Sequence, residues 1–250
     1  MKFIKKQYIL DNNVDLILID KRLPYEIEEN LTKKDIKIIK TTECSNLYNA
    51  IKYHPDISVC KLDYNNIVVE PNVYYYYNNI LSNYKFNIIK GFSTLESKYP
   101  NNIQYNVAFL GNFAIHNFKY TDKKILDFIE NNNITKINVS QGYSKCCICI
   151  VDDNSIITSD IGIHKEVIKY GIDSLIIQNG HIDLFELNYG FIGGCSGLLS
   201  KDELAFLGDI KKHPDFEKIY DFSFRKNINI TSLGKNKLLD LGYIIPLTKK

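Results

Sequence analysis

The chain has 250 residues, of which 45% are hydrophobic, and 31 basic side chains nearly balance 29 acidic ones. Such a length fits one large domain or two small ones, and the hydrophobic content is sufficient for a sizeable core. Because charge is balanced and no basic block occurs, neither nucleic acid nor an anionic membrane surface is expected as a partner. No apolar run approaches the roughly 20 residues that span a bilayer, and no signal peptide is expected, so the sequence predicts a cytoplasmic protein.

The predicted elements fall into five units in chain order. A complete unit has a hairpin of two strands, then a helix, then a third strand, and the first unit lacks one hairpin strand. The expected strands of the five units are 14–20 and 36–39; 58–63, 67–69 and 87–89; 107–110, 113–115 and 136–139; 147–151, 156–158 and 175–177; and 191–199, 204–207 and 229–231. The expected helices are 26–32 after Pro24, one after Pro71, 122–131 with Thr121 as its N-cap, 164–170, and one after Pro214.

An internal echo relates the second unit to the fourth. The segment 60–68 aligns without a gap on the segment 149–157 at a constant offset, since 149 − 60 and 157 − 68 are both 89. Both segments have the pattern of a tight hairpin with an Asx turn. A period that contains one helix indicates a repeat architecture of ββαβ units. No such unit could bury its apolar face alone, so one domain over residues 1–250 is expected.

One predicted strand, 242–247, has no partner except the incomplete first unit. Pairing it with residues 14–20 would close a ring and remove exposed sheet edges. The segment 200–203 also matches a helix capping box, but the unit pattern favours a turn there. The sequence therefore predicts an α/β fold, a five-bladed β/α propeller closed by the C-terminal strand.

Six cysteines are expected to be free thiols in the cytoplasm. Cys146 and Cys149 form a CxxC pair, but no second pair or His cluster completes zinc-type spacing, and no metal is expected. On a strand, Cys147 and Cys149 would share one face and Cys146 would take the other. Core packing is the favoured role for Cys147 and Cys149.

The predicted architecture resembles the pentein fold of the guanidino-group-modifying enzymes. That superfamily includes arginine and agmatine deiminases, dimethylarginine hydrolases, amidinotransferases and a non-enzymatic ribosome anti-association factor. Within it, the chain is similar to an uncharacterised bacterial family. The resemblance is carried by the segments 141–146, 156–160, 190–194, 213–215 and 239–246.

The resemblance implies candidate site residues. Enzymes of the fold grip a planar guanidinium with carboxylates and attack its carbon with a thiolate. Pro55-Asp56-Ile-Ser-Val59 is similar to the segment that carries a substrate carboxylate in dimethylarginine hydrolases. Gly180-His181-Ile-Asp183 is similar to an agmatine deiminase motif in which the His is catalytic and the Asp binds substrate. A plain turn after the strand 175–177 remains the alternative for His181 and Asp183.

The nucleophile of those enzymes is missing here, because Ile245 stands where their C-terminal Cys would be. Standard guanidine hydrolysis is therefore not expected, and a relocated nucleophile, Cys195 or Cys146, stays open beside a packing role for both. Asp56, Lys145 and Gly194 occupy equivalent unit positions, and Cys146 and Cys195 follow the last two. These positions predict a ligand site in a central channel, or an Asp56–Lys145 pair that merely fills it.

The sequence leaves open two functions of different classes, one of binding and one of catalysis. The favoured one is a small-molecule-binding or scaffold protein on a pentein fold that has lost its usual chemistry. The alternative is a C–N hydrolase or amidinotransferase-like enzyme on a guanidino or amide compound, with Cys195 and His181 as catalytic residues. The expected partner is a small polar or guanidino ligand bound by Asp56, Lys145, Cys146, Asp183 and Gly194. No cofactor is expected, since the chain has no Gly-rich phosphate loop, and self-association is left open.

Overall fold

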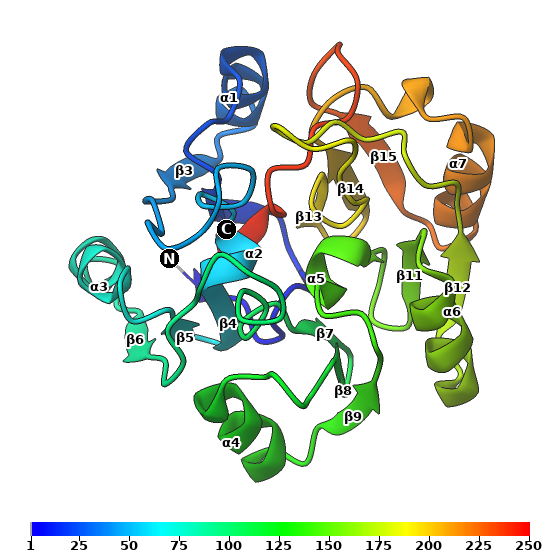
Figure 1. Ribbon diagram of the computed structural model, residues 1–250. Helices are drawn as coiled ribbons and strands as arrows, with labels where there is room; N and C mark the ends of the chain where they lie inside the picture. The colour runs from blue at the N-terminus through cyan, green and yellow to red at the C-terminus, as the bar shows by residue number, and fades with distance from the viewer. Residues whose placement is uncertain (1) are drawn as a thin grey trace.

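Five small β-sheets lie around a common centre, and longer helices cover their outer sides (Figure 1). This computed structural model describes residues 2–250, and Met1 lies outside the described residues. The first sheet has the order β1-β16-β2-β3, and each of the other four has three strands consecutive in sequence. The chain is thus an α/β protein with several small sheets, as the sequence predicts.

Each sheet and its outer helix come from one stretch of chain, apart from the C-terminal strand of the first. The first set is β1 Lys2–Phe3, β2 Val14–Ile19, α1 Tyr25–Thr32, β3 Lys37–Lys40 and β16 Ile245–Lys249. The second set is β4 Val59–Asp63, β5 Asn66–Val69, α3 Tyr74–Ser82 and β6 Asn87–Lys90. The third set is β7 Ala108–Leu110, β8 Phe113–His116, α4 Lys123–Asn131 and β9 Thr135–Asn138. The fourth is β10 Cys149–Ile150, β11 Ser155–Thr158, α6 Ile161–Val167, the 3₁₀ turn η1 Ile168–Tyr170 and β12 Asp173–Ile176. The fifth is β13 Ser196–Ser200, β14 Glu203–Phe206, the 3₁₀ turn η2 Ile210–Lys212, α7 Phe216–Arg225 and β15 Asn229–Ser232.

The two hairpins related by the sequence echo have the same register. Cys60 lies opposite Val68 in one, and Cys149 lies opposite Ile157 in the other, which preserves the offset of 89 residues. In both sheets the second strand then pairs in parallel with the strand that follows the helix. A helical crossover is the usual connection between parallel neighbours, so each stretch of ββαβ pattern produces its own three-stranded sheet.

The C-terminal strand pairs with the first sheet, as expected. β16 runs antiparallel to β2, with Ile245 opposite Leu18 and Pro246 opposite Ile17. Proline cannot donate to a ladder, and the register shifts just after Pro246. On its other side β16 pairs with β1. The two ends of the chain therefore lie in one sheet.

Several helix starts differ from the expected ones for local reasons. Asp122, rather than Thr121, caps α4 by accepting a hydrogen bond from the Lys124 amide at 2.8 Å, because the Thr121 hydroxyl bonds to Nδ1 of His116 at 2.6 Å. The helix α6 begins at Ile161, before the expected residue 164, because the Asp160 carboxylate caps it. A short polar side chain before the first turn is decisive in both helices.

The expected strands 58–63, 147–151 and 191–199 all begin later than predicted. Two helical turns, α2 Pro55–Ser58 and α5 Ser144–Cys147, precede β4 and β10, and β13 begins only at Ser196. The face prediction for Cys146 and Cys147 is therefore wrong, because both lie in a helical turn. Cys147 and Cys149 are nevertheless buried. One cluster of buried apolar side chains extends from Ile4 to Leu247.

No helix within residues 2–250 is both long and apolar enough to cross a bilayer.

Candidate functional site

The turns α2 and α5 lie near the centre of the molecule and bring Asp56 and Cys146 together (Figure 1). The Cys146 thiol donates a hydrogen bond to Oδ2 of Asp56 at 3.1 Å. Buried Asn106 links the two turns, because its amide donates to the Asp56 carbonyl at 2.9 Å and its oxygen accepts from the Lys145 amide at 2.8 Å. This arrangement fixes a thiol beside a carboxylate.

A cavity of about 290 Å³ opens beside these turns. Its walls carry four aromatic rings, and its polar groups include a thiol, an imidazole and a carboxylate. The lining residues are Tyr48, Ile51, His54, Tyr143, Cys146, Leu184, Leu187, Asn188, Tyr189, Phe191 and Asp240. An apolar concavity with a few convergent polar groups is the usual form of a ligand site.

Asp240 is the carboxylate of this cavity. Its Oδ2 accepts a hydrogen bond from the Phe191 amide at 2.8 Å, and its Oδ1 accepts one from the Gly242 amide at 3.0 Å. Gly190 and Gly194 leave room for it, since a Cβ at either position would overlap with the carboxylate. Burial, together with the nearby charge of Asp56, raises the pKa of Asp240 to about 7. Near neutral pH, Asp240 therefore exchanges readily between its acid and its ionised form.

His54 lies between two buried carboxylates without a hydrogen bond to either. Its Nε2 is 3.9 Å from Oδ2 of Asp20, and its Nδ1 is 3.8 Å from Oδ1 of Asp240. Arg22 already pairs with Asp20 at 2.6 Å. Burial and the charge of Arg22 lower the pKa of His54 to about 3, so the imidazole is neutral at physiological pH.

Lys145 is buried and does not line the cavity. Its Nζ is 2.9 Å from the centre of the Tyr243 ring and 5.0 Å from that of Tyr8. Within residues 2–250, no ion pair of 4.0 Å or less joins Lys145 to Asp56, so the simple pairing considered from the sequence is absent. Burial lowers the pKa of Lys145 to about 7.

The structure brings some predicted site residues together. Asp56 and Cys146 share a hydrogen bond, and the Gly194 amide donates to the Cys146 carbonyl at 3.0 Å. Cys195 is buried outside the cavity lining, and its thiol donates to the Ile192 carbonyl at 3.3 Å.

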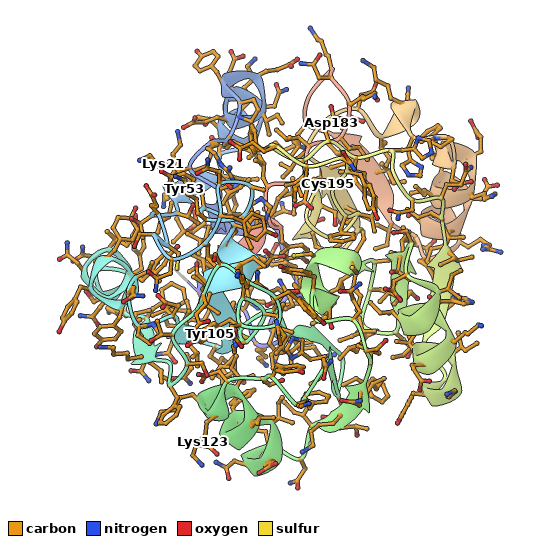
Figure 2. All side chains as sticks on the ribbon, viewed as in Figure 1. Lys21, Tyr53, Tyr105, Lys123, Asp183 and Cys195 are labelled. Atoms are coloured by element: carbon orange, nitrogen blue, oxygen red, sulfur yellow. The ribbon has the colours of Figure 1, made fainter. Side chains whose placement is uncertain are left out.

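His181 and Asp183 lie elsewhere, which corrects the expectation that all these side chains converge. Both are exposed, because the segment between β12 and β13 crosses the surface. The His181 ring packs against His213, and Asp183 lines a separate hollow of about 130 Å³. Figure 2 shows Asp183 toward the edge of the molecule and Cys195 nearer its centre. In the part of the chain that is described, no hydrogen bond joins either residue to Cys146 or Cys195.

Asp240 and the aromatic walls were missed from the sequence. Asp240 lies in a segment, 239–246, that carried the family resemblance but suggested no chemistry. The glycine at position 242, two residues after Asp240, could have indicated a close approach of the backbone to other groups. Gly242 has φ +71, and a side chain there would strain the backbone and overlap with His54 and Asp56. Tyr48, Tyr143 and Phe191 lie outside every strand and every longer helix, where periodicity gives no guidance.

Within residues 2–250, no group of three or more His, Cys, Asp or Glu side chains is arranged to hold a metal ion.

Solved structures similar to this chain include two amidinotransferases and an agmatine deiminase. An amidinotransferase of the saxitoxin biosynthetic pathway from Microseira wollei has 9% identity and a TM-score of 0.57, covering 92% of each chain. Inosamine-phosphate amidinotransferase from Streptomyces griseus has 8% identity and a TM-score of 0.59, covering 100% of this chain and 97% of its own. Agmatine deiminase from C. jejuni has 12% identity and a TM-score of 0.54, and the alignment covers 93% of this chain and 90% of the deiminase. At such identities the likeness shows the fold, which is the pentein fold.

No curated protein sequence is significantly similar to this chain. A family model, described as a family of unknown function (DUF6873), matches residues 18–245. That match spans most of the chain, and the fold agrees with the resemblance found in the sequence. The chain therefore belongs to the family DUF6873.

Proposed function

We propose that this protein binds a small organic cation with a planar amidinium or guanidinium group, with Asp240 as its counter-ion. The observation that carries the proposal is the position of Asp240, a buried carboxylate at a cavity whose walls include Tyr48, Tyr143, Tyr189 and Phe191. Aromatic faces attract cations, and a carboxylate pairs with a guanidinium through two parallel hydrogen bonds. Anionic and aromatic groups are thus combined as cation recognition requires.

The local charge balance supports a cationic ligand. Asp20, Asp56 and Asp240 are all buried, and the guanidinium of Arg22 is committed to Asp20. His54 is neutral, so it offers Asp240 no charge. Two accepted backbone bonds leave about half of the acceptor positions of the Asp240 carboxylate free. A cation would offset the cost of keeping this carboxylate ionised in a buried place.

A second candidate function is an enzyme of the C–N hydrolase or amidinotransferase type with Cys146 as nucleophile. The observation that favours it is that Cys146 lines the same cavity and hydrogen-bonds to Asp56. Burial and the charge of Asp56 raise the pKa of the Cys146 thiol well above its usual range, so the resting group is the thiol. Sulfur addition to the amidinium carbon would then require transfer of the thiol proton to Asp56. The departing amine would take up that proton from Asp56, and addition of water or a second amine to the same carbon would then break the C–S bond, with a proton of the incoming group returned to the Cys146 sulfur.

Calorimetric titration with benzamidine and methylguanidine tests the binding proposal. We expect the wild-type protein to bind at least one of them, and Asp240→Asn to weaken that binding at least about tenfold, because a neutral amide loses the ion pair. Asp127→Asn changes a partly exposed carboxylate of α4 outside the cavity and is the matched control. Unchanged affinity in Asp240→Asn would show that the counter-ion is misassigned.

The enzymatic candidate has its own test. Amine or ammonia release that is present in the wild-type protein and lost in Cys146→Ser would establish it, provided that the variant still binds the cation. Release that persists in Cys146→Ser would exclude Cys146 as the nucleophile.

The arrangement of the five units belongs to the same proposal. We infer that residues 1–250 form one domain, a five-bladed propeller of repeated units closed by β16. The pairing of β16 with β2 and the common hairpin register of the second and fourth sheets support this inference.

A further inference from the structure

We infer that the cavity selects cations whose remaining part is apolar and uncharged, and that it discriminates against guanidino acids such as arginine. This inference rests on the proposed cation site and names the class of ligand that the site takes. The relevant feature is the contrast between the two kinds of lining. Acidic and neutral groups surround the proposed cation site, whereas the rest of the lining is largely aliphatic and aromatic.

No lysine or arginine in the described chain lines this cavity. A ligand carboxylate would therefore leave water without a cationic partner. An unpaired carboxylate is costly to move out of water, and the ionised carboxylate of Asp240 would repel it. A ligand without that group avoids both costs while keeping its contact with Asp240.

Two buried or partly buried basic groups, Arg22 and Lys145, are committed to other contacts. The guanidinium of Arg22 donates to the Asp20 carboxylate and to the carbonyls of Asn49 and Ala50, and it lies 4.3 Å from the Phe185 ring centre. Lys145 is packed against Tyr243 and is not part of the lining. Neither can be recruited to a ligand carboxylate without breaking these contacts.

The segment between β12 and β13 supplies an apolar edge to the cavity. Leu184 and Leu187 lie close together in a tight turn, where the Leu187 amide donates to the Leu184 carbonyl at 3.3 Å. Leu187 is 48% exposed although it lines the cavity. An apolar group on the ligand would cover this side chain, and each buried CH₂ contributes about 0.8 kcal/mol before losses of entropy.

The same segment adds negative charge. Glu186, between the two leucines, is exposed and accepts a hydrogen bond from the Asn49 amide at 3.1 Å. Its carboxylate reinforces discrimination against an anionic ligand tail. At roughly 30 Å³ for each water-sized group, the cavity has room for on the order of ten non-hydrogen atoms. An alkyl- or arylguanidine of modest length meets all these conditions.

Calorimetry with a matched pair of ligands tests the inference, because butylguanidine and 4-guanidinobutanoate differ in the carboxylate that one of them lacks. We expect butylguanidine to bind at least about thirtyfold more tightly, a difference that corresponds to about 2 kcal/mol. L-Arginine, which carries both an α-ammonium and a carboxylate, is expected to bind more weakly than butylguanidine.

Two failures are distinguishable. If neither butylguanidine nor benzamidine binds, the cation site itself is wrong and the inference falls with it. If butylguanidine and 4-guanidinobutanoate bind within threefold of each other, or the acid binds better, the cation site stands and the inference about its selectivity is overturned.

A positive charge introduced at Leu187, on the apolar edge of the cavity, tests the selectivity independently. Leu187→Arg is expected to raise the affinity for 4-guanidinobutanoate at least about fivefold, because a partly exposed ion pair contributes on the order of 1 kcal/mol. Affinity for butylguanidine should fall in the same variant. Tyr75→Arg, on α3 and 77% exposed, is the control for a general increase in positive charge. An equal gain of affinity for 4-guanidinobutanoate in both variants, or no gain in Leu187→Arg, would contradict the position of Leu187 beside the ligand tail.

Discussion

At the scale of single residues, Asp240 decides what the cavity can bind. Two backbone amides and two adjacent glycines hold its carboxylate at the cavity, and burial raises its pKa to about 7. A raised pKa means that the folded protein retains a proton that the unfolded chain has lost between pH 4 and pH 7. Stability from this group is therefore lost as the pH rises through that range. A buried carboxylate that destabilises the fold when it ionises is typical of a functional group rather than a structural one.

The first prediction concerns the pH dependence of cation binding. A guanidinium remains charged throughout, and it prefers the ionised form of Asp240, which predominates above pH 7. Affinity should therefore rise about tenfold from pH 6 to pH 8 and level off above that. The pKa of Lys145 is lowered to about 7. Its protonation at lower pH adds a positive charge that disfavours a bound cation, so it also makes the affinity rise with pH. Calorimetry with benzamidine at three pH values measures the effect, and a flat or inverted profile would remove Asp240 from the site.

The second prediction concerns Gly194. A methyl group at this position would overlap with the Asp240 carboxylate. Gly194→Ala should therefore weaken cation binding at least about tenfold by displacing Asp240. Gly234→Ala, whose Cβ would lie 3.2 Å from an Ile27 side-chain carbon and outside this cavity, is the control. Full affinity in Gly194→Ala would mean that Asp240 is free to move and does not need this glycine.

At the scale of elements, the turns α2 and α5 hold Asp56 and Cys146, and Asn106 joins the two turns in addition to the hydrogen bond between Cys146 and Asp56. Each has only four residues, and such short helices depend on tertiary contacts for their stability. Asn106 supplies those contacts from the segment before β7, since it bonds to the Asp56 carbonyl and to the Lys145 amide. The relative positions of Asp56 and Cys146 therefore depend on a residue outside both turns.

Asn106→Ala is accordingly the third prediction. It leaves a buried carbonyl and a buried amide with a weaker or missing partner, which should lower the free energy of unfolding by about 2–3 kcal/mol. Urea unfolding followed by circular dichroism measures this loss. The half-buried Asn117, which also donates to one backbone carbonyl through an exposed hydrogen bond, is the matched site, and Asn117→Ala should cost under about 1 kcal/mol. Equal losses at the two positions would show that Asn106 does not join the turns.

At the scale of the whole molecule, both ends of the chain contribute to one sheet. Lys2 lies opposite Lys249 in the pairing of β1 with β16, and the Lys250 amide donates to the Asn13 carbonyl at 2.9 Å. β16 lies between β1 and β2 and buries Ile245 and Leu247. The last residues of the chain therefore complete the sheet that the first residues begin.

The fourth prediction follows from this arrangement. A circular permutant that joins the two ends through a short linker and opens the chain between Lys201 and Asp202, in the exposed turn before β14, should fold and bind benzamidine. Deletion of residues 245–250 should prevent folding, since it removes two buried aliphatic side chains, each contributing about 2–5 kcal/mol, and the antiparallel partner of β2. Circular dichroism distinguishes the outcomes. A folded deletion variant or an unfolded permutant would contradict the role given to β16.

Much of the fold could be predicted from the sequence because its causes are local. Two short apolar runs on either side of an Asx turn define the hairpin that contains Cys60 and Val68, and the same pattern 89 residues later gives a hairpin of identical register. The unpaired apolar strand at the C-terminus and the incomplete first unit predicted the pairing of β16 with β2. The sequence also has Ile245 in the segment that resembles the C-terminal, Cys-bearing segment of guanidino-modifying enzymes.

The site required the tertiary structure, because its members come from distant segments whose paths no periodicity determines. Cys146 reaches Asp56 from a helical turn where a strand was expected, and Asp240 reaches the same cavity from the last loop. His181 lies in a segment that resembles a catalytic motif of agmatine deiminases, yet this segment crosses the surface and leaves His181 exposed. Sequence pattern determines which faces of an element are buried, whereas the direction of a loop side chain depends on everything packed around it. The elements of this protein were thus determined by local sequence, and the convergence of its polar groups was decided only by the packing of the whole chain.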